Sequence, residues 1–282
     1  GSPGFSGIAD GAGSAARFNS PDTVTVDRSG NVLVADTGRI RRITLGGVVT
    51  TVAGGPSGPG DADGVGKLAR FNRPLGVAVD GNGNAFVADT SNHIVRKITP
   101  GGAVITLAGK PGITGYSDGG GSVASFYVPI GVAADGSGNV FVADSANSAI
   151  RKISAEGVVT TLAGGARSSE SGPRGYADGI GSAARFDDPV ALAVDESGLI
   201  LVADQGNGVI RTVTQSGVVT TLRDAAGNVL RFSASLQGLA LDRKGNLFVV
   251  GYNTVLKVSA SGVVSTLAGK EGAFGFADGP GS

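Results

Sequence analysis

The sequence predicts an all-β fold, a β-propeller of five four-stranded antiparallel blades. One block of motifs recurs five times along the 282 residues, which is typical of repeat architectures. Each block contains short segments rich in Val, Ile, Leu and Thr, no long segment has helical periodicity, and 50 glycines oppose helix formation. Because a four-stranded sheet cannot bury both faces alone, the sheets must pack on one another around a common axis. The alternative is an incomplete piece of a six-bladed propeller.

The repeating block defines the predicted units. It reads Ala-Asp-Gly, Ala-Arg-Phe, a proline, an apolar segment, an Asp-Gly turn, Val-Ala-Asp, a basic segment and Val-x-Thr-Leu-Ala-Gly. Four copies are clear and the fifth is degraded. We expect one propeller domain over residues 1–282, with units at about 4–54, 55–109, 110–164, 165–222 and 223–269, followed by a tail at 270–282.

Within the second unit, strands are expected at residues 76–80, 84–89, 94–99 and 103–108. The first two strands of each unit are joined by a turn that an Asp opens and a Gly closes, because Asp accepts backbone hydrogen bonds and Gly adopts left-handed conformations. Small residues such as Gly76 and Ala78 recur on the innermost strand, as crowding near an axis requires. These turns lie at residues 27–31, 80–84, 135–139, 195–198 and 242–246.

The two ends of the chain carry the same motif. Gly275 to Ser282 begins a linker that Gly7 to Ser14 already supplies. We expect a closed five-bladed monomer in which one copy lies at the seam, with a dimer closed through that seam as the alternative. The chain has no Met and opens with Gly1-Ser2, so we interpret it as a piece of a longer polypeptide or an engineered protein.

Composition excludes several classes of function. Lys and Arg total 23 and Asp and Glu total 23, so no net charge attracts nucleic acid or anionic lipid. No apolar segment approaches the roughly 18 residues that cross a bilayer. Cys is absent, which excludes disulfides and thiolate metal sites. We therefore expect neither a nucleic-acid partner nor membrane insertion.

Three residue types recur once per unit. An Asp ends the second strand of four units and could gather a cation, but a turn-capping role is favoured because every blade needs its turn. A basic residue on the third strand is expected to pair with these Asp residues or to extend over the sheet. A Phe is expected to pack each linker between blades. The three sets are Asp36, Asp89, Asp144 and Asp204; Arg41, Arg96, Arg151, Arg211 and Lys257; and Phe18, Phe71, Phe126, Phe186 and Phe232.

No catalytic, cofactor or metal residue is assigned. His93 is the only histidine, so no histidine-based metal cluster can form. The Asp-Gly turns lack the alternating carboxylates and distal Glu of calcium loops. The glutamates lie in expected turns or linkers: Glu156, Glu170, Glu196 and Glu271.

Residues that break the repeat are better candidates for partner contact, because the fold alone does not require them. The longest linker spans residues 166–174, and an aromatic residue replaces Thr, Ser or Gln of the sister units after the second strand of the fifth. An exposed aromatic provides contact area at low entropic cost. The candidates are Tyr252, Asn253, His93, Arg167 and Arg174.

The motifs Pro-x-Gly-Val-Ala-Val-Asp, Asn-x-Phe-Val-Ala-Asp and Ile-Arg-Lys-Ile of the second and third units resemble those of NHL-repeat proteins. The long linkers are similar to those of bacterial secreted NHL proteins and of teneurin propellers. The resemblance implies a propeller that binds a partner. Two departures stand out: the fifth unit has Val249-Val250-Gly251 where the others have the Asp, and only Asp224 to Gly227 remains of its linker.

These observations favour a non-enzymatic scaffold, extracellular or periplasmic, that presents one propeller face to a protein or glycan partner and needs no cofactor. One alternative is a metal-dependent, lactonase-like propeller hydrolase. Another is a purely structural or engineered repeat protein without a ligand.

Overall fold

The fold is all-β, a β-propeller built from five antiparallel sheets. The computed structural model describes residues 4–56, 58–165, 174–232, 235–270 and 272–273. Arg167 and most of the predicted tail lie outside these residues. The chain divides into two compact units, Gly1–Val142 with Lys152–Thr160, and Ala143–Arg151 with Thr161–Ser282, so the boundary crosses the third repeat. None of the helices described is long and apolar enough to cross a membrane.

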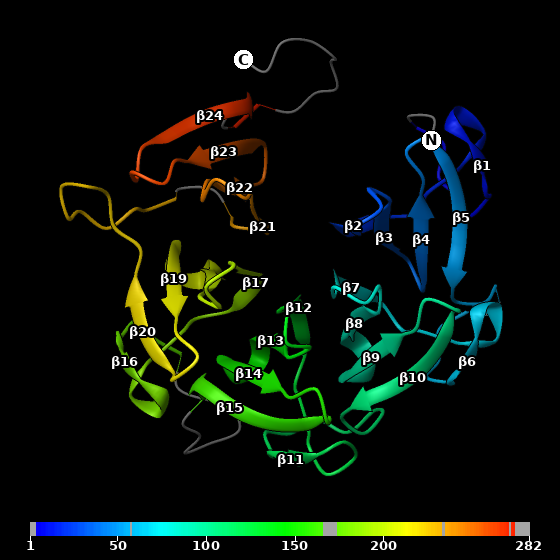
Figure 1. The fold of residues 1–282 in the computed structure, drawn as a ribbon, viewed down its shortest axis with the longest axis horizontal. Helices are drawn as coiled ribbons and strands as arrows, with labels where there is room; N and C mark the ends of the chain where they lie inside the picture. The colour runs from blue at the N-terminus through cyan, green and yellow to red at the C-terminus, as the bar shows by residue number, and fades with distance from the viewer. Residues whose placement is uncertain (1–3, 57, 166–173, 233–234, 271, 274–282) are drawn as a thin grey trace. The chain divides into compact units, whose positions relative to one another are not determined.

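The first two sheets belong to the first of these two compact units, and in each sheet the strands lie side by side in nearly sequential order (Figure 1). The first sheet has the order β1-β5-β4-β3-β2, with β1 (Gly11–Ala12), β2 (Pro21–Val26), β3 (Val32–Asp36), β4 (Arg39–Ile43) and β5 (Val48–Ala53). The second has the order β6-β10-β9-β8-β7, with β6 (Gly64–Val65), β7 (Pro74–Val79), β8 (Ala85–Asp89), β9 (Ile94–Ile98) and β10 (Ala103–Ala108).

The remaining sheets follow the same pattern. The third contains β11 (Gly119–Gly120), β12 (Pro129–Ala134), β13 (Val140–Asp144), β14 (Ala149–Ile153) and β15 (Val158–Gly164). The fourth has the order β16-β20-β19-β18-β17, with β16 (Gly179–Ile180), β17 (Pro189–Val194), β18 (Ile200–Asp204), β19 (Val209–Val213) and β20 (Val218–Thr221). The fifth has the order β21-β22-β23-β24, with β21 (Gly238–Leu241), β22 (Leu247–Val250), β23 (Thr254–Val258) and β24 (Val264–Gly269).

Four sheets therefore contain a fifth strand that the repeat pattern did not predict. It has only two residues and comes from the Ala-Asp-Gly linker, where it pairs antiparallel with the last strand of its own sheet. Gly64 lies opposite Val104 and Val65 opposite Ala103. A two-residue strand is too short to show alternating hydrophobicity, which is why the pattern predicted a loop there.

Short 3-10 helices are the only helices in the part of the chain that the structure describes. Three follow the second strand of a sheet: η3 (Thr90–Asn92), η4 (Ser145–Asn147) and η6 (Gln205–Asn207). Three lie in the linkers: η1 (Gly13–Ala15), η2 (Gly66–Leu68) and η5 (Gly181–Ala183).

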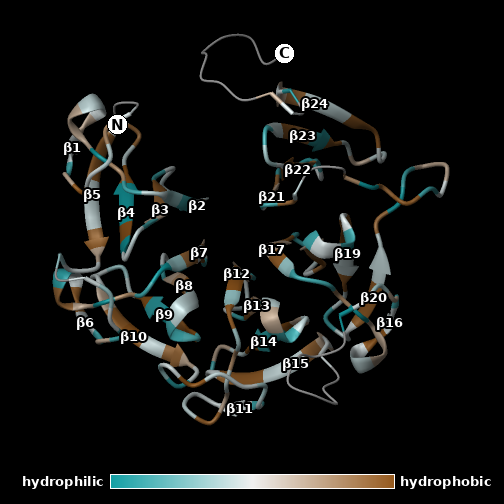
Figure 2. Cartoon of the chain, turned by 180° about the vertical axis from the view of Figure 1, so that it is seen from behind, coloured by the Kyte–Doolittle hydropathy of each residue, from teal (hydrophilic) through white to brown (hydrophobic). Residues whose placement is uncertain are grey.

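The inner strands of the first unit approach one another closely. Strand β7 packs beside β2 and β12, and a Cβ atom added to Gly76 would lie 2.2 Å from the Ile130 carbonyl oxygen. The backbones thus touch where the sequence predicted crowding. The core beside them is formed by apolar residues of adjacent repeats, including the fully buried Val142 and Phe126. Strands β4 and β9 are strongly hydrophilic (Figure 2), because β4 carries three arginines and β9 carries an arginine and a lysine.

The predicted Asp-Gly turns are confirmed. In the turn after β7, Asp80 Oδ1 accepts hydrogen bonds from the N–H groups of Asn82 and Asn84, at 2.8 and 2.9 Å, and Gly83 is left-handed with φ 80°. The segment interpreted as a linker remnant in the fifth repeat is a turn of the same kind. Asp224 Oδ1 accepts from Ala226 and Asn228 at 2.9 and 2.8 Å, because Asp-x-x-Gly-Asn makes the same side-chain bonds wherever it occurs.

Candidate ligand-binding surface

The repeated charged residues form a buried network, seen fully in the second repeat. Arg96 on β9 is 0% exposed and binds two carboxylates through different nitrogens. Its Nη1 lies 3.0 Å from Asp89 Oδ2 and its Nη2 lies 2.7 Å from Asp63 Oδ1. The guanidinium also stacks over Phe71, 5.1 Å from the ring centroid. A planar guanidinium suits this arrangement because its donors point in fixed directions.

The carboxylates of this network also accept hydrogen bonds from other groups. Asp89 Oδ1 accepts the Asn72 N–H at 2.8 Å and Oδ2 accepts the Asn92 side-chain amide at 2.9 Å. Asp63 Oδ1 accepts the Thr106 hydroxyl at 3.1 Å, so the Ala-Asp-Gly linker is fastened to the outer strand β10. Burial raises the pKa of Asp89 to about 6, although the hydrogen bonds from Asn72 and Asn92 and the charge of Arg96 lower it.

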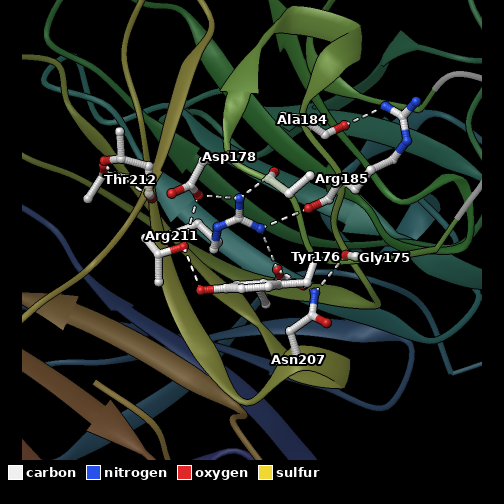
Figure 3. Close-up of polar contacts among 12 residues, drawn as sticks. Gly175, Tyr176, Asp178, Ala184, Arg185, Asn207, Arg211 and Thr212 are labelled. Atoms are coloured by element: carbon white, nitrogen blue, oxygen red, sulfur yellow. Dashed lines mark hydrogen bonds and ion pairs between the residues drawn. The ribbon is translucent and has the colours of Figure 1, made fainter. Parts of the chain in front are cut away.

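The fourth repeat has the same network (Figure 3). Arg211 lies 3.0 Å from Asp204 Oδ2 and 2.7 Å from Asp178 Oδ1. It stacks against Phe186 and Tyr176, each at 5.1 Å, and burial raises the pKa of Asp204. In the first repeat Arg41 pairs with Asp36 and Asp10, both at 2.8 Å, and in the third Arg151 pairs with Asp144 at 2.7 Å. The predicted pairing of the repeated Arg and Asp residues is thus confirmed in four repeats.

The linker carboxylates of these networks, Asp10, Asp63 and Asp178, were missed by the sequence analysis. The recurring Ala-Asp-Gly motif was the available signal, but it was interpreted only as a marker of the repeat. Burial alone would raise the pKa of Asp10, yet hydrogen bonds from Thr51 and Arg41 outweigh it and the pKa is lowered. These carboxylates therefore fasten the linker and are occupied.

The fifth repeat departs further than predicted, and the assignment of Lys257 to the arginine position was wrong. Lys257 lies opposite Phe248 on β22, as Lys97 lies opposite Phe86 on β8. The residue opposite Val249, where an arginine stands in the other repeats, is Leu256. A shift of one residue moves a side chain to the other face of a strand. Gly251 and Leu256 thus replace both members of the pair, and no charge is left buried alone.

Three of the repeated phenylalanines, Phe18, Phe71 and Phe186, lie against the arginine of their own repeat. Phe71, Phe126, Phe186 and Phe232 are buried, whereas Phe18 is half-buried beneath the guanidinium of Arg41, at 5.1 Å.

The candidate partner-binding residues are distributed over several elements. His93 is half-buried: its Nδ1 accepts the Val128 N–H at 3.2 Å and its ring meets Tyr127 edge to face at 5.8 Å. Burial lowers the pKa of His93. In the second compact unit, Arg174 pairs with Asp187 at 3.2 Å, while the Arg174 side chain remains 61% exposed.

Tyr252 and Asn253 lie in the turn between β22 and β23, where Tyr252 is 61% exposed. Glu170 and Glu271, like Arg167, lie outside the described residues. Among the residues that are described, no group of three or more His, Asp or Glu side chains is placed to hold a metal ion.

A sheet that begins near an inner glycine, ends in a linker-bound outer strand and recurs along the chain defines a β-propeller blade. Two of these blades, residues 71–98 and 126–153, match the model of the NHL repeat. The chain is a β-propeller that contains NHL repeats.

Known relatives agree over parts of their length. The chain is 44% identical over 105 residues to NHL repeat-containing protein 2 of Gallus gallus, covering 36% of this chain and 14% of that protein. It is 41% identical over 95 residues to Protein SUPPRESSOR OF QUENCHING 1, chloroplastic, of Arabidopsis thaliana, covering 33% and 9%. It is 29% identical over 233 residues to Teneurin-1 of Mus musculus, covering 73% and 8%. The chain thus spans at most 14% of the length of these three relatives.

Solved structures share the fold at low identity. A streptogramin B lyase matches with a TM-score of 0.60 at 12% identity, covering 92% of this chain and 71% of that one. A nidogen/laminin complex matches with a TM-score of 0.61 at 16% identity, covering 87% and 78%. A putative gluconolactonase matches with a TM-score of 0.56 at 14% identity, covering 87% and 74%. Binding proteins and enzymes therefore share this architecture, and the fold alone does not separate them.

Proposed function

We propose that this propeller is a non-enzymatic scaffold that binds a protein or glycan partner through residues that break the repeat. One observation carries the proposal. The recurring Arg and Asp residues are buried in mutual pairs, whereas Tyr252, whose counterpart in the second repeat is Thr90, is 61% exposed. Charged groups held in buried pairs are unavailable for chemistry on a ligand, while an exposed aromatic is typical of a binding hot spot.

The class of partner follows from this chemistry and from the relatives. An aromatic ring beside the Asn253 amide offers an apolar face and hydrogen bonds, which suit a sugar ring or a peptide. The likeness to Teneurin-1 supports an extracellular place of action. The likeness to a protein described as chloroplastic supports a different compartment. We propose an extracellular scaffold, and the identity of the partner distinguishes the two compartments.

The test uses Tyr252→Thr, which installs the residue of the second repeat. The purified chain is screened on a glycan array and against a panel of purified extracellular domains, and each hit is then titrated. We expect a saturable interaction that Tyr252→Thr weakens by roughly tenfold or more and that Arg42→Thr, at an exposed position, leaves unchanged. Hits that respond equally to both variants would contradict the proposal, as would hydrolysis of a lactone in the presence of calcium or zinc.

A further inference from the structure

A cleft of about 570 Å³ lies within the first compact unit, where it is lined by the first sheet, the second sheet and the linker between them. It opens where β3 ends and where β4 and β7 begin. Its polar walls come from Ser20, Asp22, Thr37, Arg39, Asn72 and Arg73. The volume lies within the range of about 300–1,000 Å³ that is usual for small-molecule sites.

The cleft exists because one turn of the first repeat is shorter than its counterparts. Only Thr37 and Gly38 join β3 to β4, whereas the four residues from Thr90 to His93 join β8 to β9. In the longer turn, Thr90 Oγ1 donates to the Pro129 carbonyl at 2.8 Å and His93 Nδ1 accepts the Val128 N–H. The longer turn therefore lies over the start of the following repeat.

The first repeat cannot make these contacts. Gly38, with φ 74°, has the left-handed conformation that His93 has with φ 60°, but it lacks a side chain. A Cβ atom added there would find its nearest neighbour 3.8 Å away, the Phe71 carbonyl oxygen. Arg73 is the counterpart of Val128, since both are left-handed, with φ 53° and 54°, and both precede the proline of an inner strand. Arg73 is left exposed.

The walls carry an excess of positive charge. Arg39 opens β4 where the fully buried Ile94 opens β9. Among the described residues, its guanidinium contacts the carbonyl oxygens of Thr37 and Gly55, both at the long distance of 3.4 Å. Within the described part of the chain, no ion pair engages Arg39 or Arg73. Asp22 attracts Arg73 only through its charge, which leaves one guanidinium uncompensated.

We propose that this cleft binds a small hydroxylated carboxylate, of the class of the uronic acids. A guanidinium pairs with a carboxylate through two parallel hydrogen bonds, and a single excess charge matches a monoanion. The hydroxyl of Ser20 and the amide of Asn72 offer partners for ligand hydroxyls, and the Thr37 hydroxyl, which donates to the Asn19 carbonyl, can still accept a hydrogen bond. The site is distinct from Tyr252 and goes beyond the proposed partner binding.

The test is a titration of the isotope-labelled chain with sodium glucuronate, followed by amide chemical shifts. We expect saturation at millimolar concentrations, a weaker response to acetate and none to neutral glucose. Arg39→Ile and Arg73→Val install the residues of sister repeats, so the fold is kept while each should weaken binding by roughly tenfold. Arg42→Thr removes a charge outside the cleft and should not change the affinity.

Three results would overturn the proposal: equal binding of glucose, an equal loss in Arg42→Thr, or no saturation by glucuronate. If Arg39→Ile failed to fold, as judged from its amide spectrum, Arg73→Val would carry the test. Tyr252→Thr should leave glucuronate binding intact, so failure of the scaffold proposal is distinguishable from failure of this one.

Discussion

At the scale of single residues, the same side chain serves two purposes according to its partners. Arg96 is held by Asp89 and Asp63 and is 0% exposed, whereas Arg39 makes two long contacts with carbonyl oxygens of the described residues that line a cleft. The recurring arginine stabilises a sheet and its linker, and the non-recurring one is available to a ligand. Residue type alone does not distinguish these roles, since both arginines lie on the third main strand of their sheet.

His93 makes stability depend on pH. Its pKa is lowered by burial, and the neutral Nδ1 is the form that accepts the Val128 N–H. Below its ordinary pKa of about 6.5, the unfolded chain binds a proton that the folded chain does not. The stability due to His93 is therefore present above that pH and is lost as the pH falls through the lowered folded value.

Urea unfolding between pH 7.5 and 5 tests this. We expect His93→Gly, which installs the counterpart Gly208, to lose less stability on acidification than the parent chain. Asp89 titrates in the same range with the opposite sign, because its pKa is raised to about 6, so the difference between chain and variant is the quantity measured. Ser148→Gly makes the same change at a left-handed residue and should keep the parent pH dependence. Identical acid slopes for parent and His93→Gly would refute the effect.

Pairing of the repeated Asp and Arg residues could be predicted from the sequence, because opposite charges that recur together in apolar strands must be compensated. The position of Lys257 could not. Phe248 and its partner Lys257 are two positions closer in the sequence than Phe86 and Lys97, so the connection before β23 is two residues shorter than in the second repeat. The motifs alone therefore assign Lys257 the place of Leu256. Only the strand register, with Leu256 opposite Val249, resolves this.

At the scale of elements, the inner strands set the tightest tolerance. Gly76 on β7 faces the backbone of β12, and an added Cβ atom would lie 2.2 Å from the Ile130 oxygen. Because that neighbour is backbone, it cannot move aside as a flexible side chain does. We expect Gly76→Ala to destabilise the protein by about 1–3 kcal/mol through overpacking.

Gly136 provides the control for this substitution. It lies in the turn after β12, an added Cβ atom would meet nothing within 4 Å, and its φ is not left-handed. Gly136→Ala should change the unfolding free energy by less than about 0.5 kcal/mol. Equal effects of the two substitutions in urea unfolding would show that the close strand approach is not limiting.

The four main strands of each sheet and their Asp-Gly turns were predictable, because strand periodicity and turn residues are local signals. The two-residue outer strands were not, since the pairing of Gly64 and Val65 with β10 depends on the position of a linker whose Asp63 is bound by Arg96 of another strand. The cleft was not predicted either. A turn two residues shorter is visible in the sequence at Thr37 and Gly38, but its consequence depends on what lies beneath it.

At the scale of the whole chain, the buried pair follows an all-or-none pattern. Four repeats keep the Asp and the Arg, and the fifth has Gly251 and Leu256 in their places. Loss of one partner would leave the other charge buried, which costs about 3–5 kcal/mol, whereas loss of both is tolerated. The recurring charges are thus a device of the fold, and recognition is left to positions that vary among repeats.

A double-mutant cycle on Asp89 and Arg96 at pH 7.5, where Asp89 is ionised, tests this claim most directly. We predict that Arg96→Leu alone costs about 3–5 kcal/mol of unfolding free energy in urea. With Asp89→Asn added, the double variant should be more stable than the sum of the two single losses by at least about 1 kcal/mol. Losses that add to within about 0.5 kcal/mol would contradict a structural role for the pair.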